Sequence, residues 1–161
     1  MFTLADICTI AIQIERNGEA AYRKAAEATK VPEVARVLEM LADDEANHLS
    51  WFEKMDVAQT VEIKDEQIAR IGRDLLQDMM AAQTFSLDPK ELAGTDSPKS
   101  MLDQSIEFEE DTILFYEMLS GFLDDEETKQ QLDKIIAEER THIAKLKAVL
   151  ALYQELENRV S

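Results

Sequence analysis

Apolar residues recur at three- and four-residue steps through four long stretches of this chain, the spacing that gathers them on one face of an α-helix. The first stretch runs from Leu4 to Ala28, and the second from Pro32 to Met55, opening on a residue favoured in the first helical turn. The third begins at Ser97-Pro98, and the fourth covers Asp125 to Asn158. The pattern therefore predicts four long amphipathic helices.

The connections between these helices differ in length. Short turns join the first helix to the second and the third to the fourth, whereas about 40 residues separate the second from the third. Two hairpins joined by one long crossover are the connectivity of a ferritin-like four-helix bundle. We expect one all-α domain over residues 1–161, with hairpins at 4–56 and 98–158 and the crossover at 57–97.

The crossover itself contains a shorter amphipathic segment, residues 65–83, followed by a stretch rich in helix-breaking residues. One face of this additional short helix carries Ile68, Ile71, Leu75 and Met79. Because an apolar face of this kind must be covered, it either caps the bundle or pairs with a second chain. We expect a homodimer with Ile68, Ile71 and Leu75 at its interface, which a monomeric mass by light scattering would contradict.

The amino-acid composition and net charge limit which folds and which binding partners are expected. Only 4 glycines and 3 prolines occur in 161 residues, which favours helices, and the length suffices for one hydrophobic core. The net charge of −17 makes nucleic acid and anionic membrane surfaces poor partners, and it attracts cations. The single cysteine, Cys8, excludes an internal disulfide and a Cys-x-x-Cys site. With no signal peptide and no membrane-spanning run in the sequence, a cytoplasmic protein is expected.

A set of chemically distinctive residues occurs twice, with a constant offset of 94 positions. Each copy consists of a glutamate, a tyrosine seven residues later, and a Glu-x-x-His motif that begins 30 residues after the first glutamate. Both histidines of the chain fall inside this pattern. The residues are Glu15, Tyr22, Glu45 and His48 in the first half, and Glu109, Tyr116, Glu139 and His142 in the second.

The spacing places the repeated residues at one level of the bundle. Glu15 and Glu45 lie equally far from Lys30, at the turn between their helices, so both carboxylates sit roughly 22 Å from that turn. Glu109 and Glu139 are arranged in the same way about Asp124. Within each Glu-x-x-His motif, the three-residue step puts both side chains on one helix face. Four glutamates and two histidines are therefore expected to converge inside the bundle.

Four carboxylates in an apolar interior need compensating charge, because burying unpaired charge is very costly. Two divalent cations would supply it, and a set of carboxylates and imidazoles without thiolate suits iron or manganese, with zinc as a further possible substitute. We predict that Glu45 and Glu139 bridge two metal ions, while Glu15 and Glu109 bind terminally and each imidazole binds one ion. The six ligands leave coordination positions open for O2 or peroxide.

The residues beside the ligands have two interpretations. Tyr22 and Tyr116 are either core residues or second-shell groups whose hydroxyls bind a ligand carboxylate and act in catalysis by orienting it. The acidic neighbours of the motifs are expected to be solvated surface residues. These neighbours are Glu19, Asp44, Glu107, Glu110 and Glu138.

The segment Ile14–Tyr22, together with Glu45–His48 and Glu139–His142, resembles the rubrerythrin branch of the ferritin-like superfamily. The resemblance covers the chain except, less clearly, the crossover. It implies a non-haem di-iron centre that reacts with peroxide or O2. Rubrerythrins proper also carry a rubredoxin-like domain with paired Cys-x-x-Cys motifs, which this sequence lacks, so a separate electron-donor protein is expected. They also have an additional glutamate at the position of Thr112, so redox-linked iron movement is not expected to transfer directly.

The leading hypothesis is a di-iron oxidoreductase that reduces hydrogen peroxide with an external electron donor. The alternative is a ferroxidase that oxidises Fe(II) with O2 and passes iron to storage. A third interpretation is a metal-stabilised helical bundle that serves as an interaction module. Assembly size discriminates the first two, because a shell is needed to hold a mineral core, whereas a dimer suits redox enzymology.

Overall fold

The computed structural model describes residues 2–55, 63–80 and 98–160, without the side chains of 75–80, 98, 157 and 160. In this part of the chain all regular elements longer than a single bridge are α-helices, which confirms the all-α class. The four predicted long helices are all present, and a shorter fifth helix lies in the predicted crossover. The helices are α1 (Leu4–Ala28), α2 (Pro32–Lys54), α3 (Glu66–Met80), α5 (Pro98–Ser120) and α6 (Glu126–Val160).

Local interactions fix where these helices begin. Thr3 caps α1, its hydroxyl accepting a hydrogen bond from the Asp6 backbone N–H at 3.2 Å while the Asp6 carboxylate accepts from the Thr3 N–H at 2.9 Å. Pro32 occupies the first turn of α2. Asp125 precedes α6 and accepts a hydrogen bond from the Thr128 N–H at 3.0 Å. Both α2 and α6 thus start directly after the short turns that close the two hairpins.

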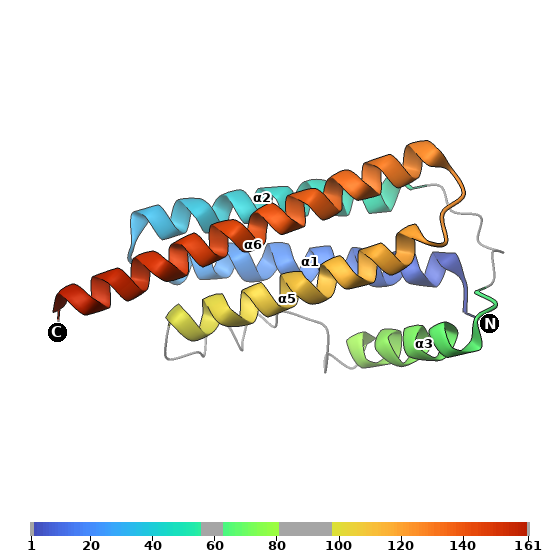
Figure 1. Cartoon of the computed structure of the whole chain (residues 1–161), viewed down its shortest axis with the longest axis horizontal. Helices are drawn as coiled ribbons and strands as arrows, with labels where there is room; N and C mark the ends of the chain where they lie inside the picture. The colour runs from blue at the N-terminus through green and yellow to red at the C-terminus, as the bar shows by residue number, and fades with distance from the viewer. Residues whose placement is uncertain (1, 56–62, 81–97, 161) are drawn as a thin grey trace.

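The long helices pair as two hairpins, α1 with α2 and α5 with α6, and lie side by side in one bundle (Figure 1). The hairpins meet through α2 with α6 and through α1 with α5. This arrangement confirms the predicted ferritin-like architecture. Leu102, Leu119 and Leu132 are among the fully buried apolar side chains of the core between the helices.

The short helix α3 packs against α1 near the beginning of the chain (Figure 1). The Ile63 N–H donates to the Phe2 carbonyl at 3.0 Å, and the Phe2 ring lies so close to Gly72 that a Cβ there would come within 2.3 Å of it. Of the residues predicted to form a dimer interface, Ile68 packs against the core of its own chain, and Ile71 is 55% exposed. The Leu75 side chain and residues 81–97 lie outside the described residues, and the homodimer stays a prediction.

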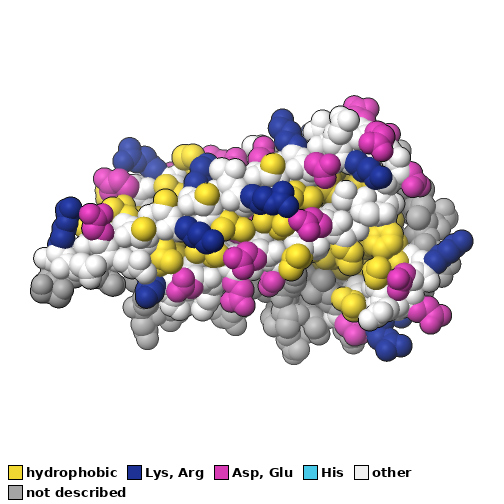
Figure 2. Space-filling model, in the orientation of Figure 1, with side chains coloured by type: hydrophobic (Ala, Val, Ile, Leu, Met, Phe, Trp, Pro, Cys, Tyr) yellow, Lys and Arg dark blue, Asp and Glu magenta, His cyan; other side chains and the backbone are white. Residues whose placement is uncertain are grey.

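The outer surface carries charges of both signs. Figure 2 shows acidic and basic side chains interspersed with apolar ones over the visible face, on which no histidine side chain is seen. Both histidines are buried, with 2% and 0% exposure for His48 and His142. None of the helices in the described residues combines the length with the apolar character required to cross a membrane.

Candidate metal centre

The four predicted glutamates and two histidines converge in the middle of the bundle. All four glutamates and His142 are 0% exposed, and the six residues come from all four long helices. Ser105 and Thr112 are also buried, and each of them donates to the carbonyl four residues earlier in its own helix. The buried charged groups are therefore gathered in one place.

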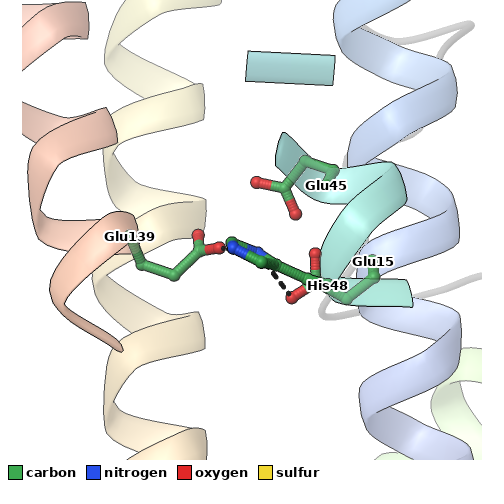
Figure 3. A group of neighbouring side chains, drawn as sticks. All are labelled: Glu15, Glu45, His48 and Glu139. Atoms are coloured by element: carbon green, nitrogen blue, oxygen red, sulfur yellow. Dashed lines mark ion pairs between the residues drawn. The ribbon is translucent and has the colours of Figure 1, made fainter. Parts of the chain in front are cut away.

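These residues form two overlapping clusters in which the potential ligand atoms lie within 4.8 Å of one another. The first is drawn in Figure 3, where the side chains from α1, α2 and α6 point toward one another. Glu45 and Glu139, the residues predicted to bridge the two ions, belong to both clusters. The clusters are Glu15, Glu45, His48 and Glu139, and Glu45, Glu109, Glu139 and His142.

Each imidazole turns its Nδ1 atom toward the carboxylates. His48 Nδ1 lies 2.7 Å from Glu139 Oε1 and 3.5 Å from Glu15 Oε1, as marked in Figure 3. His142 Nδ1 lies 3.2 Å from Glu45 Oε1 and 3.5 Å from both Glu109 Oε1 and Glu139 Oε2. The two rings are stacked with their centroids 6.0 Å apart. Both imidazoles are thus placed to offer Nδ1 to ions held between the carboxylates.

The other imidazole nitrogens contact two acidic residues that sequence reasoning assigned to the solvated surface. His48 Nε2 lies 2.5 Å from Glu138 Oε2, and His142 Nε2 lies 3.0 Å from Asp44 Oδ2. Glu138 and Asp44 remain 44% and 37% exposed, so their carboxylates contact both water and the buried rings. Treating them as solvated only was wrong. The missed signal is that an acidic residue directly precedes the glutamate of each Glu-x-x-His motif.

The remaining acidic neighbours follow the expectation more closely. Glu107 and Glu110 are exposed on α5. Glu19, half-buried on α1, accepts a hydrogen bond from Arg23 at 3.2 Å and does not contact the clusters through any described interaction. These three residues are therefore surface charges, unlike Asp44 and Glu138.

The two tyrosines donate to the terminal carboxylates, but across the bundle. Tyr22 on α1 donates to Glu109 Oε1 on α5 at 2.7 Å, and Tyr116 on α5 donates to Glu15 Oε1 on α1 at 2.5 Å. Both side chains are 0% exposed. A buried hydroxyl that binds a carboxylate at this distance holds the carboxylate in one orientation. The tyrosines are thus more than packing residues of the core.

Many polar atoms of the clusters have no hydrogen-bond partner, although buried polar groups in proteins are nearly always paired. They are carboxylate oxygens and inward-facing imidazole nitrogens, a donor set without sulfur that suits iron or manganese. A site for two cations between the helices would satisfy all of these atoms. They are Glu15 Oε2, both Oε atoms of Glu45 and Glu139, Glu109 Oε2, and the Nδ1 atoms of His48 and His142.

The pKa values of the buried glutamates and histidines are shifted from their usual ranges in the metal-free protein. Burial and the charges of neighbouring glutamates raise the pKa of Glu45 well above its usual range and that of Glu109 to about 8. Burial lowers the pKa of both imidazoles, but the neighbouring carboxylates outweigh it and raise the pKa of His48 to about 11 and of His142 to about 10. Protonation of these groups is therefore expected to offset part of the buried negative charge in the metal-free protein.

Fold and site together define a ferritin-like protein with a carboxylate- and histidine-lined dimetal centre. Residues 6–150 match the rubrerythrin family, and the chain belongs to that family. Among curated proteins, no sequence matches significantly.

Two solved structures share the fold. A Thermotoga maritima protein, assigned as a ferritin-like diiron-carboxylate protein, is 25% identical, with a TM-score of 0.67 over 94% of this chain and 95% of that chain. A hypothetical protein from Pyrococcus furiosus is 19% identical, with a TM-score of 0.69 over 96% of this chain and 92% of that chain, and shows the fold alone.

Proposed function

We propose that this protein is a non-haem di-iron oxidoreductase that reduces hydrogen peroxide with electrons from a separate donor protein. The observation that carries the proposal is the pair of clusters that share Glu45 and Glu139 and leave their inward-facing atoms without hydrogen-bond partners. The overall reaction consumes one H2O2, two electrons and two protons and gives two water molecules. The rubrerythrin family and the diiron-carboxylate assignment of the Thermotoga maritima protein both support iron as the metal.

We assign each predicted ligand a place in the proposed centre. Glu15 and His48 would hold one ion, Glu109 and His142 the other, and Glu45 and Glu139 would be shared. Iron bound there would supply two single-electron steps and Lewis acidity toward the O–O bond of peroxide. Manganese or zinc could occupy the same oxygen and nitrogen donors.

The surrounding residues keep these ligands in position. The Tyr22 and Tyr116 hydroxyls hold the terminal carboxylates from the opposite side of the bundle. With an ion bound, the carboxylates of Glu138 and Asp44 would accept the Nε2–H of each ring and leave its Nδ1 free to bind the ion.

Iron oxidation is the second candidate, favoured by the residue at position 112. Thr112 is buried, and its hydroxyl donates to the Phe108 carbonyl at 2.9 Å, so this position offers no additional carboxylate to the clusters. The remaining set of four glutamates and two histidines is symmetric, as in ferritin-like oxidases. In this reading Fe(II) is the substrate, O2 is the oxidant, and Fe(III) leaves the site.

An anaerobic Fe(II) titration followed by stopped-flow mixing with H2O2 or O2 tests both candidates. Saturation at two irons per chain, with faster oxidation by H2O2 than by O2, is expected for the peroxide reductase. The near-ultraviolet absorption of oxidised iron reports the rate. Faster reaction with O2 that continues beyond two irons per chain would favour iron oxidation, and absence of tight iron binding would contradict both.

Ligand variants show whether the binding occurs at this site. The Glu45→Ala, Glu139→Ala double variant removes both shared carboxylates and is expected to lose the two-iron stoichiometry. The matched control is Glu107→Ala, which removes an exposed carboxylate of α5. Retained binding of two irons by the double variant would contradict the ligand assignment.

A further inference from the structure

The two halves of the bundle carry the same glutamates, tyrosines and histidines at the centre, but they differ one turn after the first glutamate of each half. Three residues beyond Glu15 the chain has Gly18, whereas three residues beyond Glu109 it has Thr112. Both positions are buried. The offset of 94 residues makes the two positions equivalent in the repeat, and Gly18 faces the shared carboxylate on α2. Only the first half of the repeat therefore has a glycine at this position.

The Glu45 carboxyl group lies against Gly18. A Cβ atom added at Gly18 would come within 3.3 Å of Glu45 Oε2 and 3.4 Å of Glu45 Cδ. The separation from Oε2 is tighter than an ordinary contact of a Cβ, so a side chain at position 18 would require the Glu45 carboxylate to shift by a few tenths of an ångström. Glycine in the interior of a helix is otherwise unfavourable relative to alanine. The glycine therefore leaves room specifically for Glu45.

The shared carboxylate of the other half is held differently. Glu139 reaches both imidazoles, with 2.7 Å to His48 Nδ1 and 3.5 Å to His142 Nδ1. Glu45, among the described ion pairs, reaches only His142, at 3.2 Å. At the position equivalent to Gly18, the Thr112 hydroxyl donates to a backbone carbonyl of its own helix. Glu139 thus contacts both imidazoles, whereas Glu45 lies between His142 and Gly18.

We propose that Gly18 is a positioning residue that gives Glu45 space to retract from the metal centre, so that Glu45 is the mobile shared carboxylate and Glu139 the fixed one. In the metal-free protein, Glu45 Oε2 lies against Gly18 while Glu45 Oε1 faces His142. When cations bind, Glu45 is drawn back toward them and the space above Gly18 is released. The inference rests on the proposed dimetal site and is independent of which oxidant reacts there.

A double-mutant cycle on the metal-free protein tests the contact directly. Gly18→Ala would ordinarily raise the melting temperature, because alanine favours a helix interior. If Glu45 uses the space, Gly18→Ala lowers the melting temperature in the wild-type background and raises it in the Glu45→Ala background. A rise in both backgrounds would overturn the proposal. Should Gly18→Ala fail to fold, recovery by Glu45→Ala supports the proposal, and failure in both backgrounds overturns it.

Zn²⁺ binding, which involves no redox reaction, provides the second readout. Gly18→Ala removes the retracted arrangement of the metal-free protein, so Zn²⁺ is expected to bind about fivefold more tightly or better. Thr112→Gly would give Glu139 the space that Gly18 gives Glu45. This variant is therefore expected to bind Zn²⁺ more weakly than the wild-type protein. Unchanged affinity in Gly18→Ala would overturn the inference. Failure of the wild-type protein to bind Zn²⁺ or iron would instead overturn the proposed dimetal site. The double-mutant cycle needs no metal, so it tests the contact between Gly18 and Glu45 separately from metal binding.

Discussion

Tyr22 donates its hydrogen bond to Glu109 on the opposite hairpin rather than to Glu15, which precedes it by seven residues on its own helix. Likewise, Tyr116 donates to Glu15 on the opposite hairpin. Each imidazole also contacts an acidic residue of the opposite hairpin. Each hairpin therefore supplies the groups that orient the other hairpin's ligands. The four pairs are Tyr22 with Glu109, Tyr116 with Glu15, His48 with Glu138, and His142 with Asp44.

Replacing Tyr22 with Phe is expected to destabilise the protein by about 1–3 kcal/mol, because the fully buried Glu109 Oε1 loses its donor. The control is Tyr153→Phe, which removes a hydroxyl 3.2 Å from that of Thr29, in a partly buried contact outside both clusters. Urea denaturation at pH 7 measures both variants. Equal losses of unfolding free energy in the two variants would contradict a particular role for Tyr22.

Asp44→Asn is expected to weaken metal binding about 10–100-fold, because the carboxylate that orients the His142 ring is lost. The neighbouring Asp43 provides a matched control. Asp43 is exposed and pairs with Arg23, so Asp43→Asn changes the net charge equally without contacting an imidazole. Titration with Mn²⁺ compares the two variants. Similar affinities in both would show that only the overall charge matters.

Metal binding at neutral pH is expected to release protons. Because the pKa is raised to about 11 at His48, about 10 at His142 and about 8 at Glu109, these three groups are expected to carry protons at pH 7 in the metal-free protein. The pKa of Glu45 is also raised. Cations must displace these protons, so the apparent affinity falls as the pH is lowered. A pH indicator in weakly buffered solution measures the release. Binding of Zn²⁺ without proton release would contradict this electrostatic arrangement.

Cys8 is expected to resist thiol reagents in the native protein. It is 6% exposed, and burial raises its pKa to about 12, so both access and the thiolate form are suppressed. Reaction with a chromogenic disulfide reagent at pH 8 should be slow in buffer and rapid in denaturant. Rapid labelling of the native chain would show that α1 opens locally near its first turns.

The ligand set could be predicted from the sequence because it depends on distances along the helices. Equal spacing from a turn fixes the height of Glu15 and Glu45, and a three-residue step fixes the face shared by Glu45 and His48. Contacts between hairpins depend instead on how helices rotate against one another. For this reason the sequence alone identifies neither the partners of the tyrosines nor the contacts of Asp44 and Glu138, at the edge of the inner face, with the imidazoles.

The helices of the bundle do not pack against one another equally, and this affects what the contacts between the two hairpins do for stability. Helices of the same hairpin pack together far more extensively than helices of different hairpins. Cations at the centre would bind α1, α2, α5 and α6 at once and so strengthen the weaker of these two associations. Because such cations bind only the assembled centre, they would add about 2.7 kcal/mol at a concentration 100 times their Kd. A chelator would then loosen the association between the hairpins before it affected either hairpin itself, and metal supply would set how cooperatively the chain unfolds.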